Sequence, residues 1–202
     1  MSTTSGYHGS CHCGNIKYQI RLTFPPSLTD IDPKAKTIRI YKCNCSTCHK
    51  MGYFHLRPIS IPDDFILTSP STIEELGEYR CREKKVGWYF CKNCGVRTFA
   101  LGGEWEQVEL DVQKWAGKQE SGAAKLEKVW RSTKGIEITQ EVDGKRVSKP
   151  VHYLSVNAVT LESGQEGAEL KEWHEKGWVF YVDSKNRKEV MRFGEPHEGG
   201  MY

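Results

Sequence analysis

The 202-residue sequence predicts a mainly β domain, made of small sheets whose connecting turns carry clusters of cysteines. Three observations lead to this fold class. Short stretches of alternating apolar and polar residues recur along the chain, as in half-buried strands. Seven of the eight cysteines fall into three clusters, and each cluster lies next to one of these stretches. No apolar run approaches the roughly 18 residues that a membrane-spanning helix needs.

Five strands are predicted around the cysteine clusters. Residues 16–22 alternate after the first cluster, and residues 37–41 alternate before the second. Residues 65–67 and 88–90 are shorter candidates, and the latter lead directly into the third cluster. Residues 96–101 lead away from it. This recurring order of strand, cysteine-bearing turn and strand indicates that bound metal holds the turns together.

The segment from about 102 to 149 is interpreted as an elaboration inserted into a single domain that spans 1–202. Residues 122–131 are the strongest helix candidate of the chain, with Ser121 as the expected N-cap. The predicted fold class is therefore a set of small, metal-stabilised sheets with an inserted helix and hairpin.

The hairpin is predicted from residues 136–147, which alternate around the turn dipeptide Asp143-Gly144. Another strand is expected within residues 151–161, after the inserted segment.

The charge of the chain bears on its class of partner, and the composition of its N-terminal residues bears on its compartment. The formal net charge is +3, and the two short basic patches, at 80–85 and 185–188, are expected to be solvated turns. Binding to nucleic acid is therefore disfavoured. The N-terminus has neither the basic region nor the apolar region of a secretory signal. We expect a chain of the cytosol or nucleus, with a small-molecule partner and no membrane association.

Two cysteine pairs can together form one four-thiolate zinc site. Cys91 and Cys94 lie in a Cys-x-x-Cys-Gly turn, and the strand that follows Cys11 and Cys13 would lie beside it. Clustered thiols in a reducing compartment hold metal more often than they form disulfides. A redox role is the usual alternative for Cys-x-x-Cys, but the βαβ pattern of a thioredoxin-like motif is absent from the sequence. This site is expected to be structural.

The remaining cluster, Cys43, Cys45 and Cys48, is a trio close enough in sequence to converge on one ion. Structural zinc has four protein ligands, whereas catalytic zinc typically has three and one open position. Three thiolates on Zn²⁺ leave a net negative charge, and a soft metal favours soft ligands, so a thiol such as glutathione would suit the open position. The cysteine count thus predicts two zinc ions per chain.

Three histidines near these clusters in the sequence are candidates for a fourth ligand of the trio. His12 is the poorest, because it points to the opposite side of a strand from its cysteine neighbours. His49 would need an awkward turn to reach the metal bound by Cys48. The first interpretation of each of the three, His55 included, is a residue that lies at the surface or beyond the direct metal ligands. Cys81, outside the clusters, is interpreted as a free structural thiol.

The three clusters resemble those of the glutathione-dependent formaldehyde-activating enzyme family, which includes the centromere protein V-like proteins. The family pattern is Cys-x-Cys, then Cys-x-Cys-x-x-Cys, then Phe-Cys-x-x-Cys-Gly, and the chain matches it at 11–13, 43–48 and 90–95. Residues 154–161 resemble the strand that follows in the family, so the resemblance covers most of the chain. The segment at 102–149 is longer than in compact members, and His49 replaces a frequent arginine.

The resemblance implies a β-rich fold of small sheets around zinc and a carbon–sulfur lyase activity. It also implies two sets of zinc ligands, namely Cys11, Cys13, Cys91 and Cys94 for the structural ion, and Cys43, Cys45 and Cys48 for the catalytic ion.

We therefore expect a zinc-dependent carbon–sulfur lyase-like enzyme that acts on a glutathione or other thiol adduct, with S-(hydroxymethyl)glutathione synthesis as the family example. One alternative is the same scaffold acting on a different small molecule. Another is a non-catalytic zinc module that binds protein or nucleic acid. Four polar residues are candidate acid–base helpers, with a solvated surface role as the alternative for each: His49, Lys50, His55 and Arg57.

Overall fold

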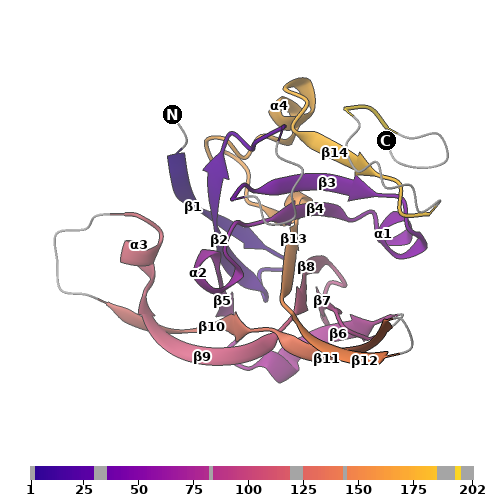
Figure 1. The fold of residues 1–202 in the computed structure, drawn as a ribbon. Coiled ribbons are helices and arrows are strands. Elements are labelled where there is room, and N and C mark those ends of the chain that lie inside the picture. The colour runs from indigo at the N-terminus through magenta and orange to yellow at the C-terminus, as the bar shows by residue number, and fades with distance from the viewer. Residues whose placement is uncertain are drawn as a thin grey trace.

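The computed structural model describes residues 3–29, 36–81, 84–118, 125–142, 145–185 and 194–196. Over these residues the chain is mainly β, as the sequence predicted, with short helices between the strands. The strands form two larger sheets and one two-stranded hairpin (Figure 1).

The first large sheet has five strands, all paired antiparallel. It contains both strands that flank the first cysteine pair. In spatial order its strands are β1 (Thr3–Ser10), β2 (Lys17–Phe24), β5 (Phe65–Ser69), β10 (Leu126–Lys134) and β9 (Glu104–Asp111).

The second large sheet has seven strands and carries the other two cysteine clusters. Its pairs are antiparallel except for the first two strands, which run parallel. In spatial order its strands are β14 (Val179–Val182), β3 (Arg39–Cys43), β4 (Phe54–Arg57), β13 (Tyr153–Asn157), β8 (Arg97–Gly102), β7 (Gly87–Cys91) and β6 (Leu76–Arg80).

The helices are short connectors. They are α1 (Ser46–Met51), α2 (Ile61–Asp64), α3 (Val112–Trp115) and α4 (Leu170–Glu175), with 3₁₀ turns at η1 (Ile73–Glu75) and η2 (Ala158–Thr160). Within the described segments, none of the helices has the length and apolar composition to cross a bilayer.

The helix predicted over 122–131 is wrong. Residues 126–134 form β10, which pairs with β5 on one side and β9 on the other, and Val129 is buried against Ile66 and Val112. Pairing on both edges outweighs the local helix preference of this Lys-Leu-Glu-Lys stretch. The predicted N-cap, Ser121, lies outside the described residues.

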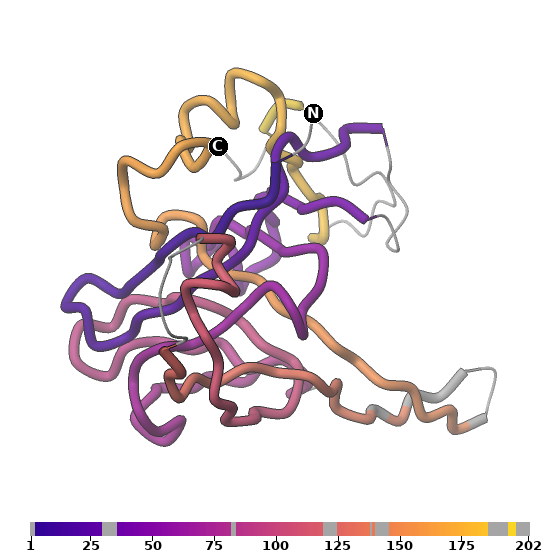
Figure 2. Tube along the Cα trace, turned by 90° about the vertical axis from the view of Figure 1, so that its left-hand side faces the viewer, coloured from indigo at the N-terminus to yellow at the C-terminus, as the bar shows by residue number. Residues whose placement is uncertain are grey.

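The predicted hairpin is confirmed. Strands β11 (Ile136–Val142) and β12 (Lys145–Val151) pair antiparallel in a sheet of their own, and they project from the two larger sheets in Figure 2. The turn dipeptide at 143–144 lies outside the described residues. The strand expected within 151–161 is β13, which ends at Asn157 and is followed by η2.

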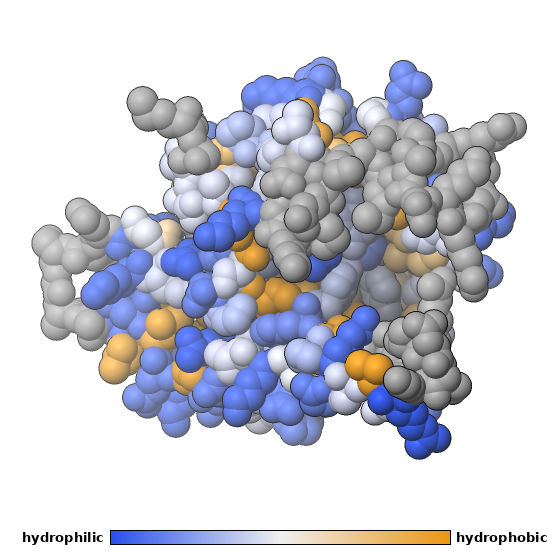
Figure 3. All heavy atoms as spheres, in the orientation of Figure 1, coloured by the Kyte–Doolittle hydropathy of each residue, from blue (hydrophilic) through white to orange (hydrophobic). Residues whose placement is uncertain are grey.

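Both large sheets contribute to one hydrophobic core. Tyr18 and Phe65 of the five-stranded sheet contact Phe99 of the seven-stranded sheet, with ring centroids 6.3 Å and 5.3 Å from it. Trp173 of α4 is fully buried and packs on Phe24 of the first sheet. On the face seen in Figure 3, apolar side chains form separate areas among hydrophilic ones. The sheets are thus held as one packed unit by aromatic contacts.

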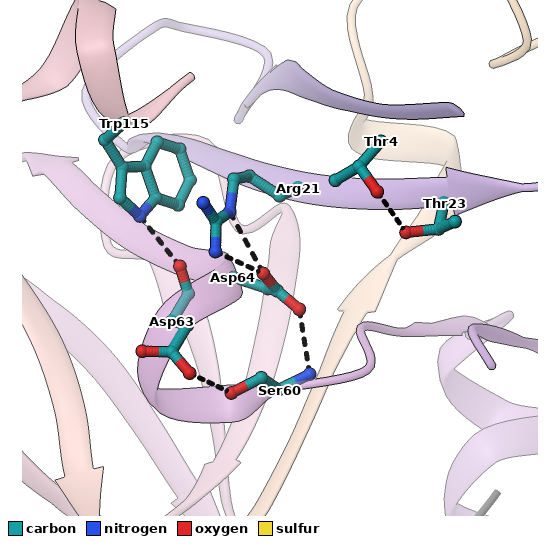
Figure 4. Close-up of polar contacts among 7 residues, drawn as sticks. All are labelled: Thr4, Arg21, Thr23, Ser60, Asp63, Asp64 and Trp115. Carbon is teal, nitrogen blue, oxygen red and sulfur yellow. Dashed lines mark hydrogen bonds and ion pairs between the residues drawn. The ribbon is translucent and has the colours of Figure 1, made fainter. Parts of the chain in front are cut away.

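A polar network fixes α2 to the five-stranded sheet (Figure 4). Arg21 of β2 donates to the Asp64 carboxylate at 3.0 Å, and the Ser60 backbone amide donates to the other carboxylate oxygen at 2.8 Å. The indole of Trp115 in α3 donates to the backbone carbonyl of Asp63 at 2.7 Å. Asp64 is buried, so pairing with Arg21 and an amide offsets its loss of hydration.

Gly9→Ala should destabilise the protein. A methyl group on Gly9 of β1 would lie 2.2 Å from Cζ of Tyr18. Tyr18 is buried and its hydroxyl is 2.8 Å from that of Thr160, so the ring has no room to move aside. We expect a loss of about 1–3 kcal/mol in the free energy of unfolding, measured by urea denaturation. Gly194→Ala is the matched control, because a methyl group there meets no atom within 4 Å; equal stability of the two variants would contradict the packing.

Candidate metal centres

Two turns from different sheets bring four cysteines together. Cys11 and Cys13 lie in the turn between β1 and β2, and Cys91 and Cys94 lie at the turn between β7 and β8. Each turn contains a glycine in the left-handed region, with φ of 77° at residue 14 and 73° at residue 95. Glycine adopts this conformation without a steric penalty, so at each turn the backbone can reverse direction directly after the cysteines.

The four sulfur atoms lie within 4.8 Å of one another. The distance from Cys13 to Cys11 is 3.7 Å and from Cys13 to Cys91 is 3.5 Å. Zinc–sulfur bonds of about 2.3 Å in a tetrahedron place neighbouring sulfur atoms about 3.8 Å apart. All four cysteines are free thiols. The donor set and its spacing therefore fit a closed zinc site.

Hydrogen bonding and burial give the thiols of this cluster different pKa values. A hydrogen bond with the Asn93 side chain, assisted by a backbone hydrogen bond from Asn15, lowers the pKa of the Cys13 thiol to about 6. Burial raises the pKa of the Cys91 thiol to about 11. Cys13 is therefore a thiolate at neutral pH, whereas Cys91 is a thiol that must lose its proton when a metal binds.

The trio is built by the end of β3 and the start of α1. Cys43 is the last residue of β3, Cys45 is the N-cap of α1, and Cys48 lies on the buried side of that helix. The Cys45 sulfur accepts a hydrogen bond from the Cys48 amide at 3.5 Å, in the manner of an N-cap side chain. Gly52 ends the helix with φ of 58°. The end of β3 and this short helix thus bring the three thiols of the trio together.

The three trio sulfur atoms also lie within 4.8 Å of one another, and Cys45 and Cys48 are 3.3 Å apart. Among the described residues, no fourth histidine, cysteine or carboxylate joins this group. Hydrogen bonding within the trio lowers the pKa of Cys45 and raises that of Cys48. These thiols cannot all ionise independently. A bound cation would allow all three to be thiolates at once, so the donor set fits a metal.

His55 lies directly beside the trio. Its Nε2 atom is 3.2 Å from the Cys48 sulfur, and its Nδ1 atom is 2.9 Å from the Ser155 hydroxyl and 3.3 Å from that of Tyr153. The ring stacks on Tyr41 with centroids 4.3 Å apart. Burial lowers the pKa of His55 to about 3, so the imidazole is neutral at physiological pH. A hydroxyl that donates to Nδ1 leaves the ring proton on Nε2, facing Cys48.

The other histidines and candidate helpers lie further from the trio. His49 and Lys50 are on the exposed side of α1, and His12 is exposed in the turn of the four-thiol cluster. Arg57 lies over the ring of Tyr153, 4.8 Å from its centroid. Tyr153 in turn contacts His55. The structure thus brings one of the four predicted helpers, His55, into contact with a trio sulfur.

Several neighbours of the trio were not predicted from the sequence. Ser155 and Tyr153 of β13 contact His55 from about 100 residues away in the chain. Ser184, after β14, contacts the Cys43 sulfur. Cys81 packs at the edge of the same cluster, with its sulfur 3.6 Å from the Thr47 hydroxyl. No cysteine spacing signals these contacts, because each joins the trio to a strand or segment remote in sequence.

The described residues also line two hollows that contain no cysteine. One, of about 700 Å³, lies along β1 and the region of α4, and includes His8 and Trp178. The other, of about 620 Å³, lies near η1 and includes Ser71 and Trp130. Neither hollow has a cysteine in its wall.

The sequence pattern of the family described as "Glutathione-dependent formaldehyde-activating enzyme" matches residues 6–130. This span is more than half of the chain and contains all seven clustered cysteines. The chain belongs to this family. Family membership confirms the resemblance drawn from the cysteine spacing. The match ends within β10, so β11 to β14 and α4 lie beyond it.

One solved structure similar to this family member is the crystal structure of a Rhodobacter sphaeroides protein that was a structural genomics target. The two are 17% identical, and the alignment covers 79% of this chain and 91% of that chain, with a TM-score of 0.38.

Replacing Cys91 with serine should remove metal and lower stability. The variant keeps the shape of the residue but removes a thiolate from the four-thiol cluster, where metal binding and folding are coupled. A loss of about 3 kcal/mol corresponds to a fall of about 6–12 °C in Tm for a chain of this size. We expect such a fall, together with the loss of about one zinc per chain by elemental analysis. Cys81→Ser is the control, and a Cys91→Ser variant that matches it in both measurements would contradict a structural site.

Proposed function

We propose that this protein is a zinc-dependent carbon–sulfur lyase-like enzyme that acts on a glutathione or other thiol adduct. The proposal includes two zinc ions per chain, one at each thiol cluster. The observation that carries it is the trio itself, in which three thiols converge beside a neutral, buried histidine and no fourth ligand joins them among the described residues. Three protein ligands are typical of catalytic zinc.

The four-thiol cluster has a structural role in this proposal. It joins the turn between β1 and β2 to the turn between β7 and β8, and four protein ligands fill a tetrahedral zinc site completely. No position is left for a substrate. The cluster therefore stabilises the arrangement of the two sheets, while the trio is assigned the chemistry.

The family reaction is the addition of a thiol to an aldehyde. A bond forms between the glutathione sulfur and the carbonyl carbon of formaldehyde, and the thiol proton ends on the carbonyl oxygen, which gives S-(hydroxymethyl)glutathione. When bound to the trio, zinc would supply a soft Lewis acid that favours the thiolate form of the substrate. Cys43, Cys45 and Cys48 would hold that ion and set its charge.

His55 is assigned a positioning role toward the trio. We assign the tautomer in which Nδ1 accepts from a hydroxyl at 2.9 Å, and in that tautomer Nε2 donates its hydrogen to the Cys48 sulfur at 3.2 Å. A hydrogen bond to a sulfur ligand orients that ligand and spreads its negative charge. Because the ring is neutral, His55 does this without adding a positive charge beside the trio.

Aromatic side chains surround His55 and keep water from that side of the trio. Tyr41 stacks on the imidazole, while Tyr53 and Trp88 approach it with ring centroids 4.7 Å and 5.9 Å away. Tyr53 and Trp88 are buried. A wall of this kind lowers the local dielectric and strengthens hydrogen bonds to sulfur.

A second candidate function is the same chemistry, or a related one, on a different small molecule. The observation that favours it is that Tyr153 contacts His55, and Ser184 contacts Cys43, from outside both the span matched to the family and the family-like stretch at 154–161. The surroundings of the trio therefore depend on residues that the family pattern does not specify, and a shared fold does not determine the substrate.

The direct test compares turnover by wild type, Cys45→Ser and Cys81→Ser with glutathione and formaldehyde. Exchange NMR measures the rate of S-(hydroxymethyl)glutathione formation above the uncatalysed rate. We expect Cys45→Ser to lose about 100-fold or more of the acceleration, because the variant lacks a trio thiolate, and Cys81→Ser to retain it. Identical rates for wild type and Cys45→Ser would refute the proposal. Turnover of another thiol adduct but not of this one would favour the second candidate.

A further inference from the structure

The chain after β14 runs alongside the trio. Strand β14 pairs parallel with β3, and Val182 lies opposite Cys43 in the register. Residues that follow Val182 therefore pass the point where the chain turns from Cys43 toward Cys45. This segment lies beyond the span matched to the family, which ends at residue 130.

Asn44, between two trio cysteines, fastens this segment with three hydrogen bonds. Its backbone amide donates to the Val182 carbonyl at 3.1 Å, and its side-chain amide donates to the Asp183 carboxylate at 2.6 Å. Its side-chain carbonyl accepts from the Lys185 amide at 2.9 Å. Asn44 and Asp183 are both buried, so the hydrogen bond between their side chains forms in a low-dielectric setting that strengthens it.

Ser184 lies between the two anchored residues and faces a trio ligand. Its hydroxyl oxygen is 3.1 Å from the Cys43 sulfur, within hydrogen-bond distance for a sulfur atom. A Cys43 thiol donates to the hydroxyl, whereas a Cys43 thiolate accepts from it. Deprotonation of Cys43 on metal binding would thus reverse the direction of this bond without moving either atom.

We propose that residues 182–185 are part of the trio metal centre, with Ser184 as a positioning residue for Cys43. The Asn44–Asp183 hydrogen bond holds the segment, and the Ser184 hydroxyl donates to the Cys43 thiolate. His55 contacts a second trio sulfur, that of Cys48, at 3.2 Å. Two of the three trio sulfur atoms therefore contact a residue outside the cysteine pattern.

This inference rests on the part of the proposed function that assigns a metal to the trio, and it does not depend on the reaction. Contacts to a metal ligand from an outer residue typically change metal affinity by about 10–100-fold. A purely structural role for the segment, as an attachment of β14 to the sheet, would require Asn44 and Asp183 but not the hydroxyl of Ser184.

The test measures zinc affinity and uses no substrate, so a failure of the proposed reaction leaves its result intact. Zinc-loaded full-length protein is titrated with a chromogenic chelator, and the weaker of its two zinc sites is followed. Cobalt(II) is then added to protein in which the four-thiol cluster retains zinc, so that the sulfur-to-cobalt absorption reports on the trio alone. The variants are Ser184→Ala, which removes the hydroxyl, and Ser184→Thr, which retains it. Ser148→Ala, on the exposed hairpin strand β12, is the matched control.

We expect Ser184→Ala to weaken zinc binding at the trio by about 10-fold or more and to alter the cobalt absorption. Ser184→Thr should remain close to wild type, and Ser148→Ala should be unchanged. Zinc at the four-thiol cluster should be retained in every variant. Affinity of Ser184→Ala within twofold of wild type would overturn the proposal, as would equal losses in the alanine and threonine variants. A wild-type chain that binds a single zinc would also overturn it.

Discussion

The approach of two cysteine-bearing turns, one from each large sheet, is the constraint that organises this structure. The turn after β1 carries Cys11 and Cys13, and the turn after β7 carries Cys91 and Cys94. Their sulfur atoms come within 4.8 Å of one another and so connect the five-stranded sheet to the seven-stranded sheet. A metal at this point would add its binding energy to the aromatic core that the sheets already share. The trio follows this arrangement as well, because Cys43 is the last residue of β3 and β3 is a strand of the seven-stranded sheet.

The trio differs from the four-thiol cluster in what surrounds it. Its cysteines come from one strand end and one helical turn, and their neighbours come from β4, β13 and the segment after β14. His55 and Ser184 each contact one sulfur, and aromatic rings cover the histidine. Hydrogen bonds of this kind stabilise thiolates and hold them in place. The structure therefore combines a linking cluster with a second cluster set among polar and aromatic side chains.

The parts of this structure that are local in sequence could be predicted, and the parts that depend on remote contacts could not. Cysteine spacing within each turn predicted both thiol clusters, and alternation predicted β2, β3 and the two hairpin strands. The stretch at β10 was predicted as a helix because its composition favours one, whereas one of its two partner strands, β5, lies far away in the chain. The same limit applies to the site, since Ser184 is 141 residues from Cys43 and Ser155 is 100 residues from His55.

We propose that the two thiol clusters hold zinc in two different ligand sets. X-ray absorption at the zinc edge of the purified wild-type protein tests it most directly. Four sulfur ligands on one ion and three on the other give an average of about 3.5 sulfur atoms per zinc, at about 2.3 Å. A lighter atom would be the fourth ligand of the ion at the trio. The account predicts this average with two zinc ions per chain. A single zinc per chain, or an average of four sulfur atoms, would contradict it.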